Sequence, residues 1–374
     1  MSRKKNKISK VFCIFSIENT SKLIDMKKLL PATLLFLLFS AVFIKVDAQQ
    51  KPYYTQYILN NYILNPALTG IENYTDLKMS YRRQWSGIPG APITTYVSIH
   101  APIGKTDFRT SATSYQIPGE NMRGKKYWDE EYMPAEAHHG LGAIVMDDKT
   151  GYLDRISVYG TYAYHKGISP NTSLAIGFLA GVTNVTLDWS KIVWGALDPN
   201  DPAIGYTSGA INRFSTELGA GLWLYSSDYF AGASVLNIVP GKIDFSKSKN
   251  PFASYYAPQF IGTAGYKFYL NDDVTLLPSF MAQFIKPFPV QVHINVKAQY
   301  HDLCWIGASY RISDQVGGYA AMAGINVGNF MNIGYSYDVS TTSRLQTYSH
   351  NTNELIIGFL INNKYGDSCP RNLW

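Results

Sequence analysis

The stretch Val290–Tyr300 alternates strictly between apolar and polar residues, and this pattern constrains the fold more than any other feature of the chain. The apolar members are Val290, Val292, Ile294, Val296, Ala298 and Tyr300, and the polar members are Gln291, His293, Asn295, Lys297 and Gln299. Successive side chains of a strand point to opposite faces, so the stretch predicts a strand with one apolar and one polar face. It is also about as long as the ~9–11 residues with which a tilted strand crosses a bilayer.

The same alternation recurs in Arg155–His165, Arg213–Tyr225 and Asn332–Asp338. A soluble sandwich would also have one polar face, so alternation alone does not separate a sandwich from a membrane barrel. The spacing of the turns favours the barrel. Short turns at 226–228, 271–273, 301–302 and 328–329 alternate with longer loops at Val185–Gly209, Ile238–Tyr255 and Val339–Thr352. Short turns on one rim and long loops on the other are typical of transmembrane barrels.

Tyrosine and tryptophan residues lie near the ends of the predicted strands, where the two interfaces of a membrane would be. The residues concerned are Trp85, Tyr96, Trp223, Tyr225, Tyr255, Tyr256, Tyr269, Tyr300 and Trp305. A soluble aromatic core is the alternative explanation for these rings. Together with the turn spacing, they predict an all-β fold, a transmembrane antiparallel β-barrel with short periplasmic turns and longer extracellular loops.

The patterns predict 14 strands. They are Tyr74–Trp85, Ile93–His100, His139–Asp148, Leu153–Lys166, Thr172–Asn184, Ile211–Tyr225, Tyr229–Ile238, Tyr256–Leu270, Val274–Phe284, Val290–Tyr300, Leu303–Ile312, Val316–Val327, Phe330–Tyr337 and Asn353–Asn363. An even number places both ends of the barrel on the periplasmic side. The stretch Ala101–Ala137 fits poorly, since it is long but falls on the short-turn side. It is either a periplasmic excursion or a sign that the first strands are miscounted.

The N-terminal region has the features of a secretory leader. Lys27 and Lys28 precede an apolar run, which ends in Val46-Asp47-Ala48. A basic start, a short apolar run and small residues at the cleavage site are typical of a signal peptide. We therefore expect an upstream extension at 1–25 and a signal peptide at 26–48. An N-terminal periplasmic segment at 49–73, the barrel at 74–363 and a C-terminal tail at 364–374 are expected to follow.

The positive charge of the whole chain, +6, belongs to this leader. Nine of the 33 basic residues and three of the 27 acidic ones lie in residues 1–48, so the remainder carries no net charge. A neutral mature chain gives no reason to expect a nucleic-acid partner. Two cysteines, Cys304 and Cys369, follow the leader, which is too few for a disulfide framework. We expect two free thiols, and a single bridge between them is the alternative.

No group of residues predicts catalysis, a cofactor or a metal. His138 and His139 are adjacent, so on a strand they point to opposite faces and cannot bind one metal ion. Phosphate-loop, dinucleotide and nucleophile-elbow motifs are missing from the sequence. We expect a transport or binding protein and no enzyme.

Four blocks carry a family resemblance. The first block consists of the aromatic stretch Tyr53–Tyr57 together with Leu64-Asn65-Pro66-Ala67-Leu68-Thr69-Gly70. The second block runs from Tyr81-Arg82-Arg83-Gln84-Trp85 to Pro92. The third runs from Gly140 through Asp147–Gly151 to His165, and the fourth joins Gly334–Ser340 to Glu354-Leu355-Ile356. In this order they resemble the PorP/SprF family of type IX secretion system outer-membrane proteins.

This resemblance implies an outer-membrane protein that assists export or surface retention of cargo with C-terminal sorting domains, such as gliding-motility adhesins. The implied partners are the cargo or adhesin, other type IX secretion components and outer-membrane lipid. A small-molecule channel or porin is the alternative. The motif positions for which we expect a role, structural or in partner contact, are Asn65, Pro66, Gly70, Tyr81, Arg82, Gln84, Trp85, Tyr337 and Asp338.

The residue chemistry of the motifs suggests local structure. Asn65 before Pro66 is biased away from helix and predicts a fixed turn, and Gly70 allows a positive φ. Arg82 and Gln84 are predicted to face the lumen. Latching the N-terminal segment into the barrel mouth is at least as well supported as contact with a partner.

Overall fold

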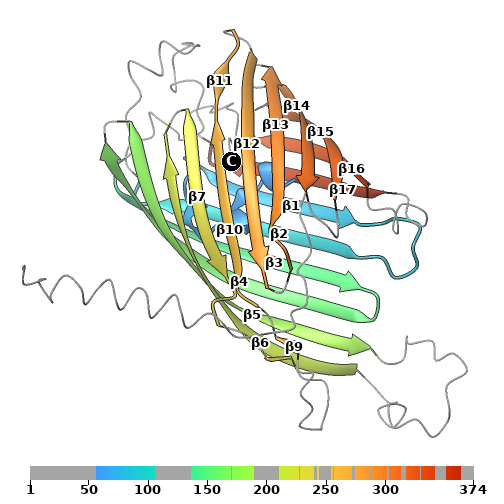
Figure 1. Ribbon diagram of the computed structural model, residues 1–374. Helices are drawn as coiled ribbons and strands as arrows, with labels where there is room; N and C mark the ends of the chain where they lie inside the picture. Colours follow the sequence, from blue (N-terminus) through green and yellow to red (C-terminus); the bar gives the residue numbers. More distant parts are fainter. Residues whose placement is uncertain are drawn as a thin grey trace, which may run out of the picture. The chain divides into compact units, whose positions relative to one another are not determined.

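The chain forms a closed antiparallel β-barrel (Figure 1). The computed structural model describes residues 56–363 except for 106–135, 170, 189–209, 227, 240–241, 244–253, 256, 272–273, 287, 301–302, 313–316, 329 and 342–350. The predicted leader and tail, and Cys369, lie outside these residues; Cys304 is described and is a free thiol. No helix in the described part is long and apolar enough to cross a membrane.

All 14 predicted strands are confirmed, with ends that differ from the prediction by a few residues. They are β1 (Thr75–Arg83), β2 (Ile93–Ile103), β3 (His138–Thr150), β4 (Leu153–Ser169), β5 (Thr172–Asp188), β6 (Ala210–Tyr225), β7 (Tyr229–Leu236), β10 (Gln259–Tyr266) with β11 (Phe268–Tyr269), β12 (Val274–Ile285), β13 (Gln291–Tyr300), β14 (Cys304–Ile312), β15 (Gly318–Val327), β16 (Met331–Ser340) and β17 (Thr352–Ile361). Two further short strands, β8 (Lys242–Ile243) and β9 (Ser254–Tyr255), pair with each other in the connection between β7 and β10.

The ring is closed by strands that lie far apart in the sequence. The first strand, β1, pairs with the last, β17, from Thr75 opposite Ile361 to Arg83 opposite Asn353. β10 and β11 are separated by Lys267 alone, and both pair with β12, so together they form one strand of the ring. Closure leaves the sheet without a free end, which is how a sheet satisfies its backbone polar groups inside a bilayer.

The alternating residues face as the sequence predicts. In β13, Ile294, Val296 and Tyr300 are on the outer surface, while the polar residues between them are buried inside. In β4, Ile156 and Val158 point outward in the same way. The barrel therefore presents an apolar exterior, as contact with lipid requires.

The rims also follow the prediction. The three longest connections on one rim are 189–209, 237–258 and 341–351, which coincide with the predicted long loops to within a few residues; we call this the loop rim. The opposite rim carries the short turns, such as 226–228, which we assign to the periplasm. Residues 101–103 belong to β2, and the connection 104–137 joins β2 to β3, which pair directly with each other from Ile93 opposite Lys149. The strand count is thus correct, and the connection starts and ends at the short-turn rim.

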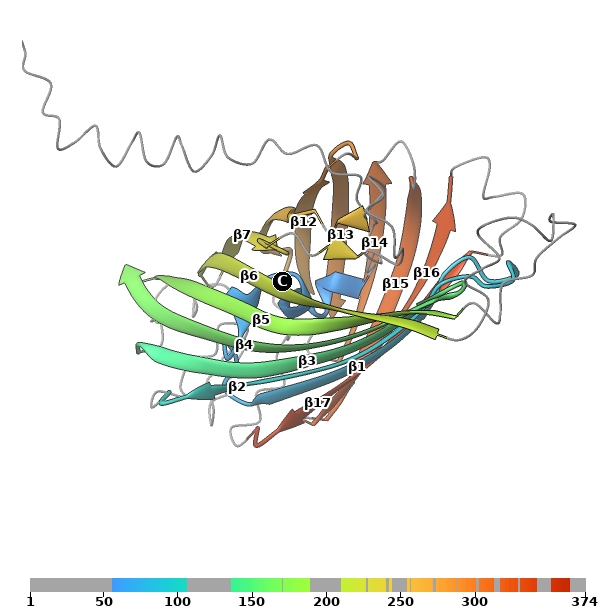
Figure 2. The ribbon, with the colours of Figure 1, turned by 90° about the horizontal axis from the view of Figure 1, so that it is seen from below.

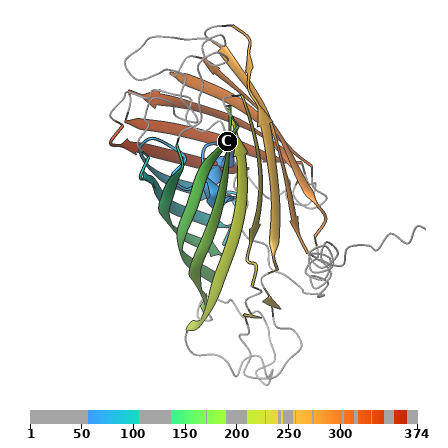
Figure 3. The same cartoon turned by 90° about the vertical axis from the view of Figure 1, so that its left-hand side faces the viewer.

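The segment before β1 lies inside the barrel. Residues 56–73 form three short 3₁₀ helices, η1 (Gln56–Ile58), η2 (Asn61–Ile63) and η3 (Pro66–Leu68), and the turns after them. Figures 2 and 3 show these helices, in blue, enclosed by the ring of strands. We call residues 56–73 the plug. We expected 49–73 in the periplasm, but from residue 57 onward every plug residue is buried. The physical reason is composition: tyrosine, leucine and isoleucine favour burial, and the asparagines Asn60 and Asn65 find hydrogen-bond partners on the wall.

The exterior assignment can be tested at Ile294, whose side chain is 48% exposed on β13. We expect Ile294→Arg to lower the free energy of unfolding by about 2–4 kcal/mol, since it places a charge in the lipid band. The control Ile294→Leu should change it by less than about 0.5 kcal/mol. Guanidinium unfolding in lipid vesicles, followed by heat-modifiable migration, measures both. Equal values for the two variants would contradict the assignment.

Candidate functional site

The loop that carries Asn65 and Pro66 fixes the plug to the barrel wall. Asn65 caps η3: its side-chain oxygen accepts a hydrogen bond from the backbone N–H of Ala67 at 3.0 Å, and Pro66 takes the first helical position. The Asn65 amide nitrogen then donates to the carbonyl of Leu222 in β6 at 3.0 Å. The Asn65 side chain therefore caps η3 and also anchors it to the wall. The predicted turn at this motif is present, and the bond to Leu222 sets its orientation.

Gly70 is where the plug turns back toward β1, and three wall histidines surround it. Its φ is +74°, as the sequence suggested. The Gly70 N–H donates to Nδ1 of His100 at 3.1 Å, and its carbonyl accepts from Nε2 of His138 at 3.2 Å. His165 stacks on His138 with ring centroids 4.6 Å apart and donates from Nε2 to the Thr69 carbonyl at 2.8 Å. The histidines satisfy backbone groups that would otherwise be buried without partners.

Glycines on the wall leave room for this close approach. A Cβ added at Gly70 would lie 2.5 Å from the Cα of Gly140 in β3. A Cβ at Gly177 in β5 or at Gly221 in β6 would overlap plug atoms of Pro66 and Asn65. Backbone therefore packs on backbone where the plug meets these strands.

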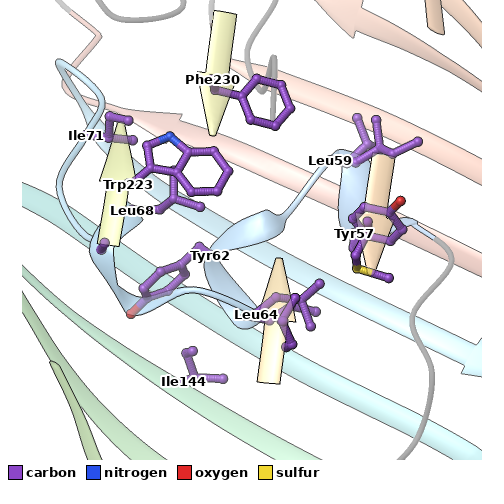
Figure 4. Close-up of a cluster of buried hydrophobic side chains, with 14 of the residues drawn as sticks. Tyr57, Leu59, Tyr62, Leu64, Leu68, Ile71, Ile144, Trp223 and Phe230 are labelled. Atoms are coloured by element: carbon purple, nitrogen blue, oxygen red, sulfur yellow. The ribbon is translucent and has the colours of Figure 1, made fainter. Parts of the chain in front are cut away.

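Apolar packing fills the rest of the contact. Figure 4 shows Leu59, Tyr62, Leu64, Leu68 and Ile71 of the plug gathered with wall residues that include Ile144, Trp223 and Phe230. Trp223, which is fully buried, stacks on Phe230 with ring centroids 5.2 Å apart. Burying one such large side chain stabilises the assembly by roughly 1.5–3 kcal/mol, so several together make dissociation of the plug costly.

Polar plug side chains reach other parts of the wall. Asn60 donates to Ser98 Oγ in β2 at 2.9 Å, and the Tyr62 hydroxyl lies 2.5 Å from Thr161 Oγ1 in β4. Tyr57 accepts a hydrogen bond from Asn295 in β13, on the other side of the barrel. Because the plug contacts strands around the ring, it spans the lumen and does not line a single wall.

Arg82 lies in a second cluster, on the wall near the loop rim. It is 1% exposed, and its guanidinium pairs with Glu354 at 2.9 Å and with Asp338 at 3.4 Å. Arg311 approaches the same Asp338 oxygen at 3.7 Å, and Ser80 donates to Glu354 at 3.3 Å. Two cations thus balance two anions across β1, β17, β16 and β14. We call these four charged residues the charge cluster.

The turn after β1 is joined to the start of β17. Trp85 has φ +45°, which is uncommon for a residue with a side chain. Its N–H donates to Thr352 Oγ1 at 3.2 Å, and the Ser86 N–H donates to the Asn351 carbonyl at 3.0 Å. These bonds compensate for the conformational cost of the turn and connect the loop rim to the charge cluster.

The predicted motif positions therefore separate into three groups. Asn65, Pro66 and Gly70 lie in the plug. Arg82, Gln84, Trp85 and Asp338 surround a small pocket beside the charge cluster. Tyr81 and Tyr337 point outward, consistent with an aromatic belt at the membrane interface. The prediction that Arg82 and Gln84 face inward is confirmed, since both are buried.

Sequence reasoning missed several residues of these clusters. Arg311 belongs to the charge cluster but lies outside the motif blocks. The sequence predicted that His138 and His139 lie on opposite faces, and the structure places His138 inward and His139 outward. The sequence did not predict that His100, His138 and His165 contact the plug. Among the described residues no group of three or more acidic, cysteine or histidine side chains is arranged to hold a metal ion. Glycines at inward positions were an available signal, since they indicate close backbone approach.

Comparison with known proteins identifies this architecture. The family model described as type IX secretion system membrane protein PorP/SprF matches residues 46–359, which include the plug and nearly all of the barrel. The chain belongs to this family. The PorP/SprF resemblance of the motif blocks is thereby confirmed, and so is a place in the outer membrane. As a member, the protein works with other parts of the type IX secretion system.

Solved structures share the barrel architecture at low sequence identity. Acinetobacter baumannii Omp33 is 7% identical with a TM-score of 0.43, over 78% of this chain and all of its own. The toluene transporter TbuX of Ralstonia pickettii is 10% identical with a TM-score of 0.45, over 81% and 92% of the two chains. The Pseudomonas putida toluene transporter TodX is 10% identical with a TM-score of 0.42, over 86% and 99%. At these values we infer nothing about function. No curated protein matches.

Gly70→Ala tests the close approach of the plug. Placing any alanine in the left-handed conformation costs roughly 1–2 kcal/mol. The loss of stability at Gly70 should be larger than this, because the new Cβ also meets the backbone of Gly140. Gly104→Ala is the matched control, since Gly104 has φ +71° and open space where a Cβ would lie. The difference between the stability losses of the two variants, obtained from their unfolding midpoints, gives the contribution of the steric clash with Gly140. If the two lost the same stability, the packing described at Gly70 would be incorrect.

Arg82→Gln tests the charge cluster. Removing one member of a buried ion pair leaves the partner charge uncompensated, so we expect a loss of about 3–5 kcal/mol. Arg83→Gln, on the exposed side of the same strand, should cost less than about 0.5 kcal/mol. Adding Glu354→Gln to Arg82→Gln should restore part of the stability, because the orphaned charge is removed. Additive losses in the double variant would argue against direct pairing.

Proposed function

We propose that this protein assists the export or surface retention of secreted proteins with C-terminal sorting domains, such as adhesins, through contact at the loop rim. Family membership supports a role in secretion. The observation that carries the proposal further is the plug: residues 57–73 are buried within the barrel and bonded to several of its strands. A barrel filled in this way suits a scaffold better than a conduit.

The loop rim is the part of the barrel best placed to recognise a partner. The strand ends that flank three long connections, 189–209, 237–258 and 341–351, lie at this rim. Loops on a rigid scaffold commonly carry recognition. The charge cluster and the Trp85 turn lie beneath this rim and brace it, so we infer that they position a docking surface. This role requires no catalysis by the chain.

The alternative, a small-molecule channel, finds little support in the lumen. A general porin needs a continuous aqueous path, and here plug side chains such as Tyr57 and Asn60 bridge to the wall. Tyr159, Trp223 and Tyr225 are buried in the lumen as well, which for Trp223 and Tyr225 overturns the expectation of a place at the membrane interface.

Deleting the gene distinguishes the two functions. We expect particular proteins to disappear from the cell surface or the culture fluid, while uptake of a small hydrophilic antibiotic stays unchanged. Proteomes of the two fractions, with and without the gene, provide the measurement. Complementation with the intact gene controls for secondary effects. Normal secretion with reduced antibiotic uptake would support the channel instead.

A further inference from the structure

The lumen contains a second feature, a pocket between the plug and the loop rim. Its floor includes Ile63 and Leu64 of the plug, and its walls include Ile144 of β3 and Met281 of β12. Leu236, the last residue of β7, also lines it and places it on the loop-rim side. The cavity itself measures about 50 Å³, so it accepts only a compact ligand.

The lining is unusual for the inside of an outer-membrane barrel. Such interiors are normally polar because water fills them. Here seven apolar side chains, from the plug and from several strands, converge on one space beside six polar ones. Apolar surface left in contact with water is unfavourable, and a molecule that covers it recovers that free energy.

One polar wall residue points to a hydrogen-bonding ligand. His293 of β13 lines the pocket and is 1% exposed. Within the described part of the chain, neither of its ring nitrogens has a hydrogen-bond partner. By contrast, the Glu217 carboxylate in the same pocket accepts bonds from Tyr159 at 2.9 Å and from Thr183 at 2.7 Å. A buried polar group without a partner is costly, and a bound molecule could relieve that cost.

We propose that this pocket binds a small organic molecule with a compact apolar body and a hydrogen-bonding group that pairs with His293. The plug closes the pocket from below, so the site is blind and holds its ligand. Since Ile63 and Leu64 form its floor, the ligand also adds contacts that hold the plug in place.

Binding can be measured by fluorine NMR on the full mature protein in lipid nanodiscs. The probe is 4-fluorophenol, and fluorobenzene serves as its analogue without a hydroxyl. We expect saturable binding of 4-fluorophenol at one site. Met146→Trp, which fills the pocket from its half-buried lining position, should weaken it at least tenfold. Val145→Trp, on the outward face of the same strand, should change it less than twofold.

The hydrogen bond is tested separately at the histidine. His293→Phe keeps a ring but removes both nitrogens, so the affinity for 4-fluorophenol should fall about fivefold, as the loss of one hydrogen bond predicts. The affinity for fluorobenzene should stay the same. His139→Phe, an outward-facing histidine, is the control and should leave both probes unaffected. Each variant is first checked for heat-modifiable migration. Non-saturable partitioning that is equal in all the proteins would overturn the proposal.

Discussion

The packing of residues 56–73 inside the barrel is the interaction on which the other features depend. The closed ring of strands satisfies its own backbone, but its inward face carries many polar side chains that need partners. The plug supplies them, with Asn60 and Tyr62 bonded to strands on one side and Tyr57 on the other. It also brings the apolar side chains that make a compact core. The lumen therefore resembles the interior of a soluble domain enclosed by a membrane wall.

This arrangement links the sequence motifs to one another. The Asn65-Pro66 block and Gly70 set the path of the plug, and that path requires glycines and histidines on β2 to β6. The Arg82 block is tied to Asp338 and Glu354, more than 250 residues away in the sequence, because ring closure places β1 beside β17. The first group secures the plug at the periplasmic end, and the second braces the loop rim. A mutation in either block should therefore affect stability before it affects recognition.

The barrel could be predicted from the sequence, while most of the lumen could not. Alternation of period two, as in Val290–Tyr300, specifies a strand and its two faces without knowledge of its neighbours. The plug has no such period: its 3₁₀ turns are set by contacts with strands distant in sequence. The alternation showed that His293 and Asn295 face inward. It could not show that Asn295 donates to Tyr57, or that His293 has no hydrogen-bond partner among the described residues. Ring closure predicts that β1 lies next to β17. The partners of Arg82 also depend on the register in which these two strands pair, and the sequence does not determine that register.

The central claim is that the plug is a fixed part of the protein and does not leave for function. Asn60 of the plug is hydrogen-bonded to Ser98 of β2. The double variant Asn60→Cys with Ser98→Cys should therefore form a disulfide that locks the plug to the wall. It is made in a background that carries Cys304→Ser and Cys369→Ser. The direct measurement is the amount of cargo displayed on cells that make the locked protein, with and without reductant. We expect display equal to that of the unlocked background in both conditions. Loss of display that reductant restores would contradict the account, since it would mean that the plug has to move.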